Sequence, residues 1–127
     1  MPRKGSPTLT EAELRLMEIL WDRGEATVGD VVSAVAASEP LAYSSVLTTM
    51  RILERKGYTR HRKEGRAFVY TPVVDRDSAR SSAVRFIMDR FFDRSAESMM
   101  LNILQTKGLD NGELERLKRM IEESDSE

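Results

Sequence analysis

Residues 42–72, AYSSVLTTMRILERKGYTRHRKEGRAFVYTP, indicate one amphipathic helix followed at once by a short basic β-hairpin. Val46, Met50 and Leu53 recur at i, i+4 and i+7, so they form an apolar stripe on one side of the helix. Gly57 follows at the place where a helix commonly ends in a left-handed residue. A helix that passes directly into a hairpin restricts the folds that this chain can adopt.

The same helix carries a second stripe, made of the hydroxyls and cations of Ser44, Thr48, Arg51 and Arg55. Serine and threonine are mediocre helix formers, so their presence in these turns lowers the intrinsic stability of the helix. Short hydroxyl side chains let a helix backbone approach bases and phosphates closely. The stripe therefore indicates a helix that enters the major groove of DNA.

The hairpin is predicted to have strands at Tyr58–Arg62 and Ala67–Thr71, joined through residues 63–66. Residues 42–70 carry seven cations and two anions, whereas residues 75–127 carry nine cations and twelve anions. The overall net charge of −1 therefore hides a basic block beside an acidic one. The basic block can bind phosphate, whereas the acidic block cannot usefully do so.

Two helices are expected before the basic helix. The first begins with a capping box, Thr10 with Glu13, and the second with another, Thr27 with Asp30. A short break around Pro40 then separates the second helix from the third, which is the spacing of a helix-turn-helix. The inward positions of the first two helices are predicted to be Leu14, Met17, Leu20, Trp21, Val31, Val32 and Val35.

After Pro72 the pattern changes to three amphipathic helices, at about 75–93, 96–106 and 110–123. About fifty residues of amphipathic helix are too few to bury all of these apolar faces by themselves. We therefore expect a second copy of the chain to cover them. The predicted fold is mainly α with a small β-hairpin: a winged helix-turn-helix in residues 1–74 and a helical dimerisation domain in residues 75–127. The predicted dimer contacts are Ile87, Phe91, Met100, Ile103, Leu104, Leu114, Leu117 and Ile121.

Composition argues against several other classes of protein. The chain has no cysteine, no apolar run long enough to span a bilayer, no Gly-rich phosphate loop and no metal-ligand cluster. Its one histidine, His61, lies between Arg60 and Arg62, which suits a neighbour of phosphate better than a general base. We therefore expect a cytoplasmic protein without enzyme activity, metal, cofactor or stable membrane association.

Four segments resemble the penicillinase-repressor (BlaI/MecI-type) family: EAELRLMEILW, ERKGY, HRKEGRAFVYTP and SMMLN. The resemblance implies a homodimeric repressor of inverted-repeat operators, often those of β-lactamase and antibiotic-resistance genes. It also implies a membrane sensor protease that cuts the dimerisation region, here at Asn102–Ile103. Together with Arg51 from the exposed stripe, the DNA-binding residues that it implies are Ser44, Ser45, Leu47, Thr48, Arg60, Arg62, Lys63 and Arg66.

The chain departs from the family pattern at two positions. Ile103 stands where phenylalanine usually follows the scissile bond, and Leu47 stands where a polar residue often reads the operator. Leucine can contact a thymine methyl but cannot hydrogen-bond to a base. Two alternatives remain open: a regulator of the same fold for an unrelated stress or membrane-protease operon, and a winged helix used only for protein contacts.

Overall fold

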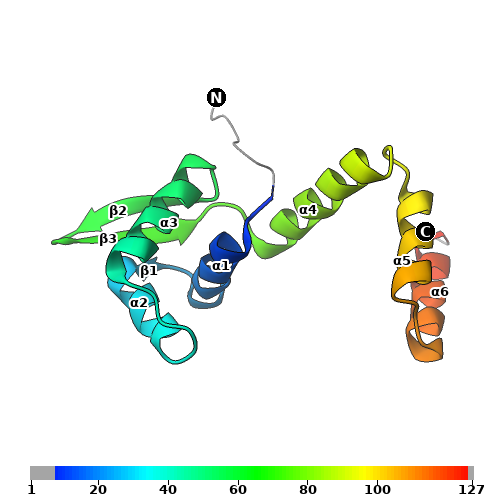
Figure 1. Ribbon diagram of the computed structural model, residues 1–127, viewed down its shortest axis with the longest axis horizontal. Helices are drawn as coiled ribbons and strands as arrows, with labels where there is room; N and C mark the ends of the chain where they lie inside the picture. Colours follow the sequence, from blue (N-terminus) through cyan, green and yellow to red (C-terminus); the bar gives the residue numbers. More distant parts are fainter. Residues whose placement is uncertain (1–7, 126–127) are drawn as a thin grey trace. The chain divides into compact units, whose positions relative to one another are not determined.

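The computed structural model describes residues 8–125 and divides into two compact units, one ending at Phe86 and the other beginning at Ile87 (Figure 1). This division falls within the fourth helix, later in the chain than residues 74 and 75, between which the two domains were predicted to meet. The elements in chain order are α1 (Glu11–Arg23), β1 (Ala26–Thr27), α2 (Val28–Ala36), α3 (Tyr43–Arg55), β2 (Thr59–Glu64), β3 (Ala67–Pro72), α4 (Arg76–Phe91), α5 (Ala96–Thr106) and α6 (Asn111–Asp125).

Both predicted capping boxes at the start of the chain are confirmed. The Thr10 hydroxyl accepts a hydrogen bond from the Glu13 amide at 3.1 Å, and the Glu13 carboxylate accepts one from the Thr10 amide at 2.9 Å. Thr27 and Asp30 make the same reciprocal pair at the start of α2, with both bonds at 3.0 Å. These bonds satisfy amides that no helical carbonyl can reach.

The three strands form one antiparallel sheet in the order β1-β3-β2. The two-residue strand β1 was not predicted, and it pairs Ala26 with Tyr70 at the far side of β3 from the hairpin partner. The hairpin is also longer than predicted, because Lys63 and Glu64 belong to β2 and only two residues form its turn. Gly65 begins that turn with a φ of 61°, a conformation that favours glycine.

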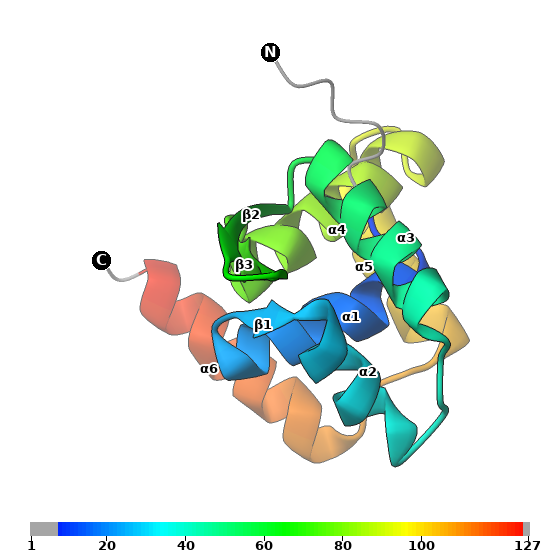
Figure 2. The same cartoon turned by 90° about the vertical axis from the view of Figure 1, so that its left-hand side faces the viewer.

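The helices α1, α2 and α3 pack against one another and against the sheet, and the core of the first unit lies between them (Figure 2). The predicted stripe of α3 is fully buried in this core, and so are Val31 and Val35 of α2. Trp21 packs against the edge of the core, and its indole nitrogen donates to the Val74 carbonyl at 2.9 Å.

One inward position of α1 was predicted wrongly. Leu14 is 41% exposed, whereas Leu16, Met17 and Leu20 are buried. The buried face of α1 therefore follows positions 13, 16, 17 and 20, and Leu14 lies off that face. The first position of the face is Glu13, whose burial the apolar pattern could not reveal.

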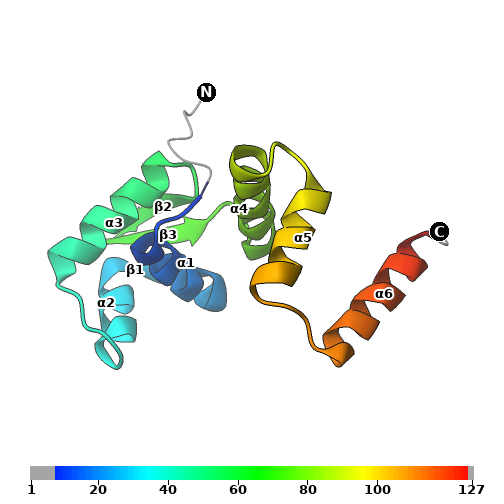
Figure 3. The same cartoon turned by 45° about the vertical axis from the view of Figure 1, so that its right-hand side comes forward.

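The second unit contains the end of α4 together with α5 and α6, which a loop through Gly108 joins (Figure 3). The bounds of these helices agree closely with the prediction. The predicted capping box of α6 is also present, with the Glu113 amide donating to Asp110 at 2.8 Å. No residue of α5 or α6 is buried within this single chain.

Candidate nucleic-acid interface

Helix α3 presents two opposite faces, as its sequence predicts. Val46, Met50 and Leu53 are fully buried, whereas the stripe of Ser44, Thr48, Arg51 and Arg55 is exposed. The buried face fixes the rotation of the helix, so the hydroxyls and guanidinium groups must point away from the core. The outward face combines short donors with positive charge, which suits a groove of DNA.

The C-terminal end of α3 is held by backbone bonds and by an ion pair. Gly57 adopts a φ of 91°, its amide donates to Glu54, and the Tyr58 amide donates to Leu53, which together form a Schellman motif. This motif turns the chain directly from the helix into the hairpin. The angle between α3 and the wing, β2 with β3, is therefore set by the backbone.

The residue after the last helical one, Lys56, adds a link from α3 to α1. Its ammonium lies 2.7 Å from the Glu13 carboxylate, and both side chains are largely buried. Burial alone would raise the pKa of Glu13, but the hydrogen bonds from Lys56 and Thr10 and the Lys56 charge hold that pKa below its usual range. The pair secures α3 against the supporting helix.

The N-terminal end of α3 differs from those of α1 and α2 because no side chain caps it. Ala42 is the N-cap residue and offers no hydrogen-bond acceptor to the first turn. The free amides of a helix start favour phosphate. Tyr43 lies in the same turn and is 57% exposed. It was not among the residues predicted to contact DNA, because a lone tyrosine gives no periodic signal.

The two faces of the wing carry different residues. His61 lies opposite Tyr70 and Lys63 lies opposite Phe68, so these four side chains share the face toward α3. Alternation along β2 places Arg60 and Arg62 on the other face. The wing cations predicted to contact phosphate therefore do not all lie together.

Among residues 8–125, Arg62 is also the one wing cation that already has ion-pair partners. Its guanidinium makes a bidentate pair with Glu25 at 2.9 and 3.1 Å and contacts Glu64 at 2.7 Å. These bonds raise the pKa of Arg62 above its usual value, so its charge is permanent. A contact between Arg62 and phosphate would have to compete with two carboxylates.

The other cations of α3 and the wing make no ion pair within the described part of the chain. The Lys63 ammonium lies 6.0 Å from the centre of the Phe68 ring and has no carboxylate partner there. Arg55 belongs to the same exposed stripe as Arg51, but it was not among the residues predicted to contact DNA. The cations without an ion pair in residues 8–125 that lie on α3 and the wing are Arg51, Arg55, Arg60, Lys63 and Arg66.

Leu47 does not share the full exposure of the other predicted contacts on α3. It is half-buried and packs against the core, whereas Ser44, Ser45 and Thr48 are exposed. Only part of the Leu47 side chain is thus available to a base.

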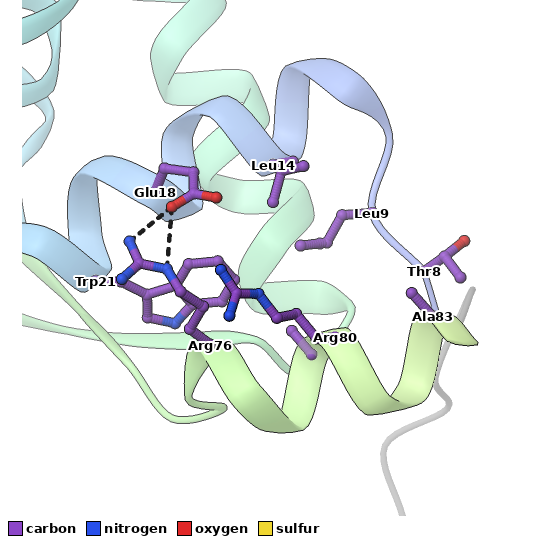
Figure 4. Close-up of a pocket in the computed structure, with 9 residues that line it drawn as sticks. Thr8, Leu9, Leu14, Glu18, Trp21, Arg76, Arg80 and Ala83 are labelled. Carbon is purple, nitrogen blue, oxygen red and sulfur yellow. Dashed lines mark hydrogen bonds and ion pairs between the residues drawn. The ribbon is translucent and has the colours of Figure 1, made fainter. Parts of the chain in front are cut away.

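A mostly apolar groove of about 180 Å³ lies between α1 and the first turns of α4, and Leu14 forms part of it (Figure 4). Arg76 crosses it, with its guanidinium 2.6 Å from Glu18, 3.0 Å from Asp22 and 5.3 Å from the centre of the Trp21 ring. These contacts link the start of α4 to α1, which gives the groove a structural role.

The residues predicted for dimerisation and cleavage all lie in the second unit. Asn102 and Ile103 lie in the middle of α5, where the Asn102 side chain accepts a hydrogen bond from Thr106 at 3.4 Å. Ile103 and Leu117 are half-buried. The other predicted dimer contacts are exposed apolar side chains: Ile87, Phe91, Met100, Leu104, Leu114 and Ile121.

Three packed helices, a β-hairpin wing and an exposed polar face on α3 together define a winged-helix DNA-binding protein. The family model described as penicillinase repressor matches residues 9–123. The chain therefore belongs to the penicillinase repressor family, as its motifs predicted.

Individual relatives agree with this assignment. The penicillinase repressor of Bacillus licheniformis is 29% identical over 120 residues, which cover 94% of both chains. The transcriptional regulator BlaI of Mycobacterium tuberculosis is 29% identical over 117 residues, or 91% of this chain and 83% of that protein. These relatives are named as regulators of transcription, a role that requires no catalysis.

The solution structure of the DNA-binding domain of the repressor BlaI matches with a TM-score of 0.54 at 29% identity. It covers 61% of this chain and 93% of that domain, which confirms the predicted winged-helix fold. Among residues 8–125, no helix is both long and apolar enough to cross a membrane.

Proposed function

We propose that this chain is a homodimeric repressor that binds an inverted-repeat operator through α3 and the wing. The observation that carries the proposal is the exposed stripe of α3, next to a wing whose cations are mostly without ion pairs. In this arrangement Ser44, Ser45 and Thr48 read base edges, and the cations contact the phosphate backbone. Leu47 adds an apolar contact to a thymine methyl.

Dimerisation is supported by the second unit, where apolar side chains such as Phe91, Leu104 and Ile121 remain exposed in the single chain. A second copy would cover these faces and place two winged helices on one DNA molecule. Linking two half-sites raises affinity without any new contact to the DNA, because the second binding event becomes intramolecular. One chain alone should therefore bind weakly.

Proteolysis by a membrane sensor protease would relieve repression. The proposed scissile bond, Asn102–Ile103, lies inside α5, so a protease would have to unwind part of that helix before cutting it. Cleavage would separate α6 from the rest of the chain and remove much of the apolar face that the dimer needs. The genes under control would be a β-lactamase-type or related operon.

The experiment is a fluorescence-anisotropy titration of the full chain against its own upstream DNA and against a scrambled duplex of equal length. With three or four phosphates neutralised per chain, a dimer should show a log–log salt slope of roughly −5 to −7. Tighter binding to the upstream duplex with such a slope supports the proposal. Equal and weak binding to both duplexes, with little salt dependence, contradicts it and favours a protein-interaction module.

A further inference from the structure

A hollow of about 320 Å³ separates α3 from the wing, on the side where the polar stripe of α3 meets the hairpin. Glu54 is the one carboxylate among the residues that line it. A carboxylate in this place would repel the phosphate that the neighbouring guanidinium groups attract. The lining residues are Arg51, Glu54, Arg55, His61, Phe68 and Tyr70.

Glu54 has a specific partner across the hollow. Its Oε1 lies 2.6 Å from Nδ1 of His61, and each side chain remains about one-third exposed. A neutral imidazole donates one hydrogen bond to Glu54 and leaves the negative charge in place. An imidazolium makes the same bond and also cancels the charge.

Two aromatic rings fix the imidazole against Glu54. The ring centres of His61 and Phe68 are 5.2 Å apart in an edge-on contact, and those of His61 and Tyr70 are 5.3 Å apart. Burial and the charge of Glu54 raise the pKa of Tyr70, so this phenol stays neutral in the range where imidazole titrates. These two ring contacts therefore help to position His61 beside Glu54.

The remaining charged groups around His61 are cationic on both sides of the hollow. Arg51 and Arg55 lie on α3, and Lys63 lies on the same face of β2. Arg60 and the paired Arg62 flank His61 along the strand. Within this set, the charge of Glu54 is the only one that opposes an approaching phosphate.

We infer that His61 is a positioning residue for DNA: as an imidazolium it holds and neutralises Glu54, so that Arg51 and Arg55 can contact the same stretch of backbone. This inference rests on the proposed function and adds to it a proton that each half-site takes up on binding. DNA phosphate favours the imidazolium, and by linkage the imidazolium favours DNA.

The direction of the pH dependence follows from this linkage. Imidazole is the side chain that changes charge between about pH 5 and 8. Operator affinity should be highest at the acidic end of this window, fall as the pH rises through it, and level off above it. A dimer with one His61 per half-site takes up at most about two protons, so log Kd should rise by no more than about two per pH unit.

The test is an anisotropy titration of the upstream duplex from pH 5.5 to 8.5 at constant ionic strength, with the full chain and three variants. His61→Gln keeps a hydrogen-bonding side chain but cannot be charged, so binding should be weak and independent of pH. His61→Lys supplies a permanent charge, so binding should be tight and independent of pH. Glu54→Gln should bind roughly threefold to tenfold tighter than the wild type at pH 8.5 and show a shallower pH slope, because the imidazolium no longer has a carboxylate to neutralise.

Glu64→Gln is the matched control, because it removes another wing carboxylate that lies outside the hollow. It should change affinity by a similar factor at every pH and keep the wild-type slope. A purely structural role for His61 predicts that His61→Lys binds as poorly as His61→Gln. Thermal melting of each variant verifies that the fold is intact.

Two failures are distinguishable. If the wild type prefers the upstream duplex but His61→Gln shows the same pH slope, the inference about His61 is wrong and the proposed function stands. If no protein prefers the upstream duplex at any pH, the proposed function fails and the inference fails with it.

Discussion

The two units of this chain solve the burial of apolar side chains in different ways. In the first unit, residues such as Met17, Met50 and Val31 are completely buried, and partners from distant elements surround them. In the second unit, α5 and α6 bury none of their residues, and Phe91 at the end of α4 is 74% exposed. The first unit therefore buries its apolar core within one chain, whereas the second leaves exposed the apolar side chains that the proposed dimer would cover.

The largest expected effect is on the core of the first unit. Replacing Met50 by Ala should lower the free energy of unfolding by about 2–5 kcal/mol, because the cavity lies among fully buried neighbours. Replacing the exposed Leu101 by Ala should change the stability of the same unit by less than about 0.5 kcal/mol. Urea unfolding followed by Trp21 fluorescence measures both, and similar losses would contradict the contrast between the units.

The next effect concerns dimerisation. Leu104→Glu should weaken the dimer by on the order of 100-fold or more, because an unpaired carboxylate would enter an apolar interface. The first unit should stay folded, since Leu104 lies outside it. Sedimentation equilibrium measures the change, with the exposed neighbour Gln105→Glu as the control of equal charge. A dimer that tolerates Leu104→Glu would place the interface elsewhere.

A smaller effect distinguishes the cations of the wing. Arg66→Ala should weaken binding to every duplex roughly tenfold and flatten the salt slope of a dimer by about two, since one phosphate contact per chain is lost. Arg62→Ala should flatten it less, because Glu25 and Glu64 already occupy its guanidinium. Equal slopes for the two variants would show that the paired and unpaired cations do not differ on DNA.

The smallest effect concerns the buried pair of Glu13 and Lys56. The pKa of Glu13 is held below its usual 4.5, so the carboxylate stabilises the fold above that pH and loses its contribution as the pH falls through the lowered pKa. Glu13→Gln should cost on the order of 1 kcal/mol at pH 7 and less at pH 3. Unfolding midpoints at both pH values measure this, with the exposed Glu11→Gln as control; a constant difference would contradict the pair.

Much of the fold could be predicted because its signals are local. The stripe of Val46, Met50 and Leu53, the two capping boxes and the terminal Gly57 all depend on residues within two turns of one another. The wing and the helices of the second unit followed from the same kind of pattern. Membership of the family followed from motifs spread over most of the chain.

The features that escaped prediction depend on distant residues. The strand β1 exists because Ala26 finds a partner in Tyr70, and two residues carry no strand signal of their own. Arg62 is engaged because Glu25 lies beside it, although 37 positions separate the two in the sequence. The exposure of Leu14 likewise depends on how α1 rotates against the core. Such pairings arise from tertiary packing, which periodicity does not encode.

The most direct test of the account is the number of chains bound to one upstream duplex, measured by sedimentation of the protein–DNA complex. We expect two wild-type chains per duplex, and for Leu104→Glu a much weaker complex that forms one chain at a time. A wild-type complex that contains a single chain, or a Leu104→Glu variant that binds with undiminished affinity, would contradict the claim that the second unit assembles the repressor and the first unit reads the DNA.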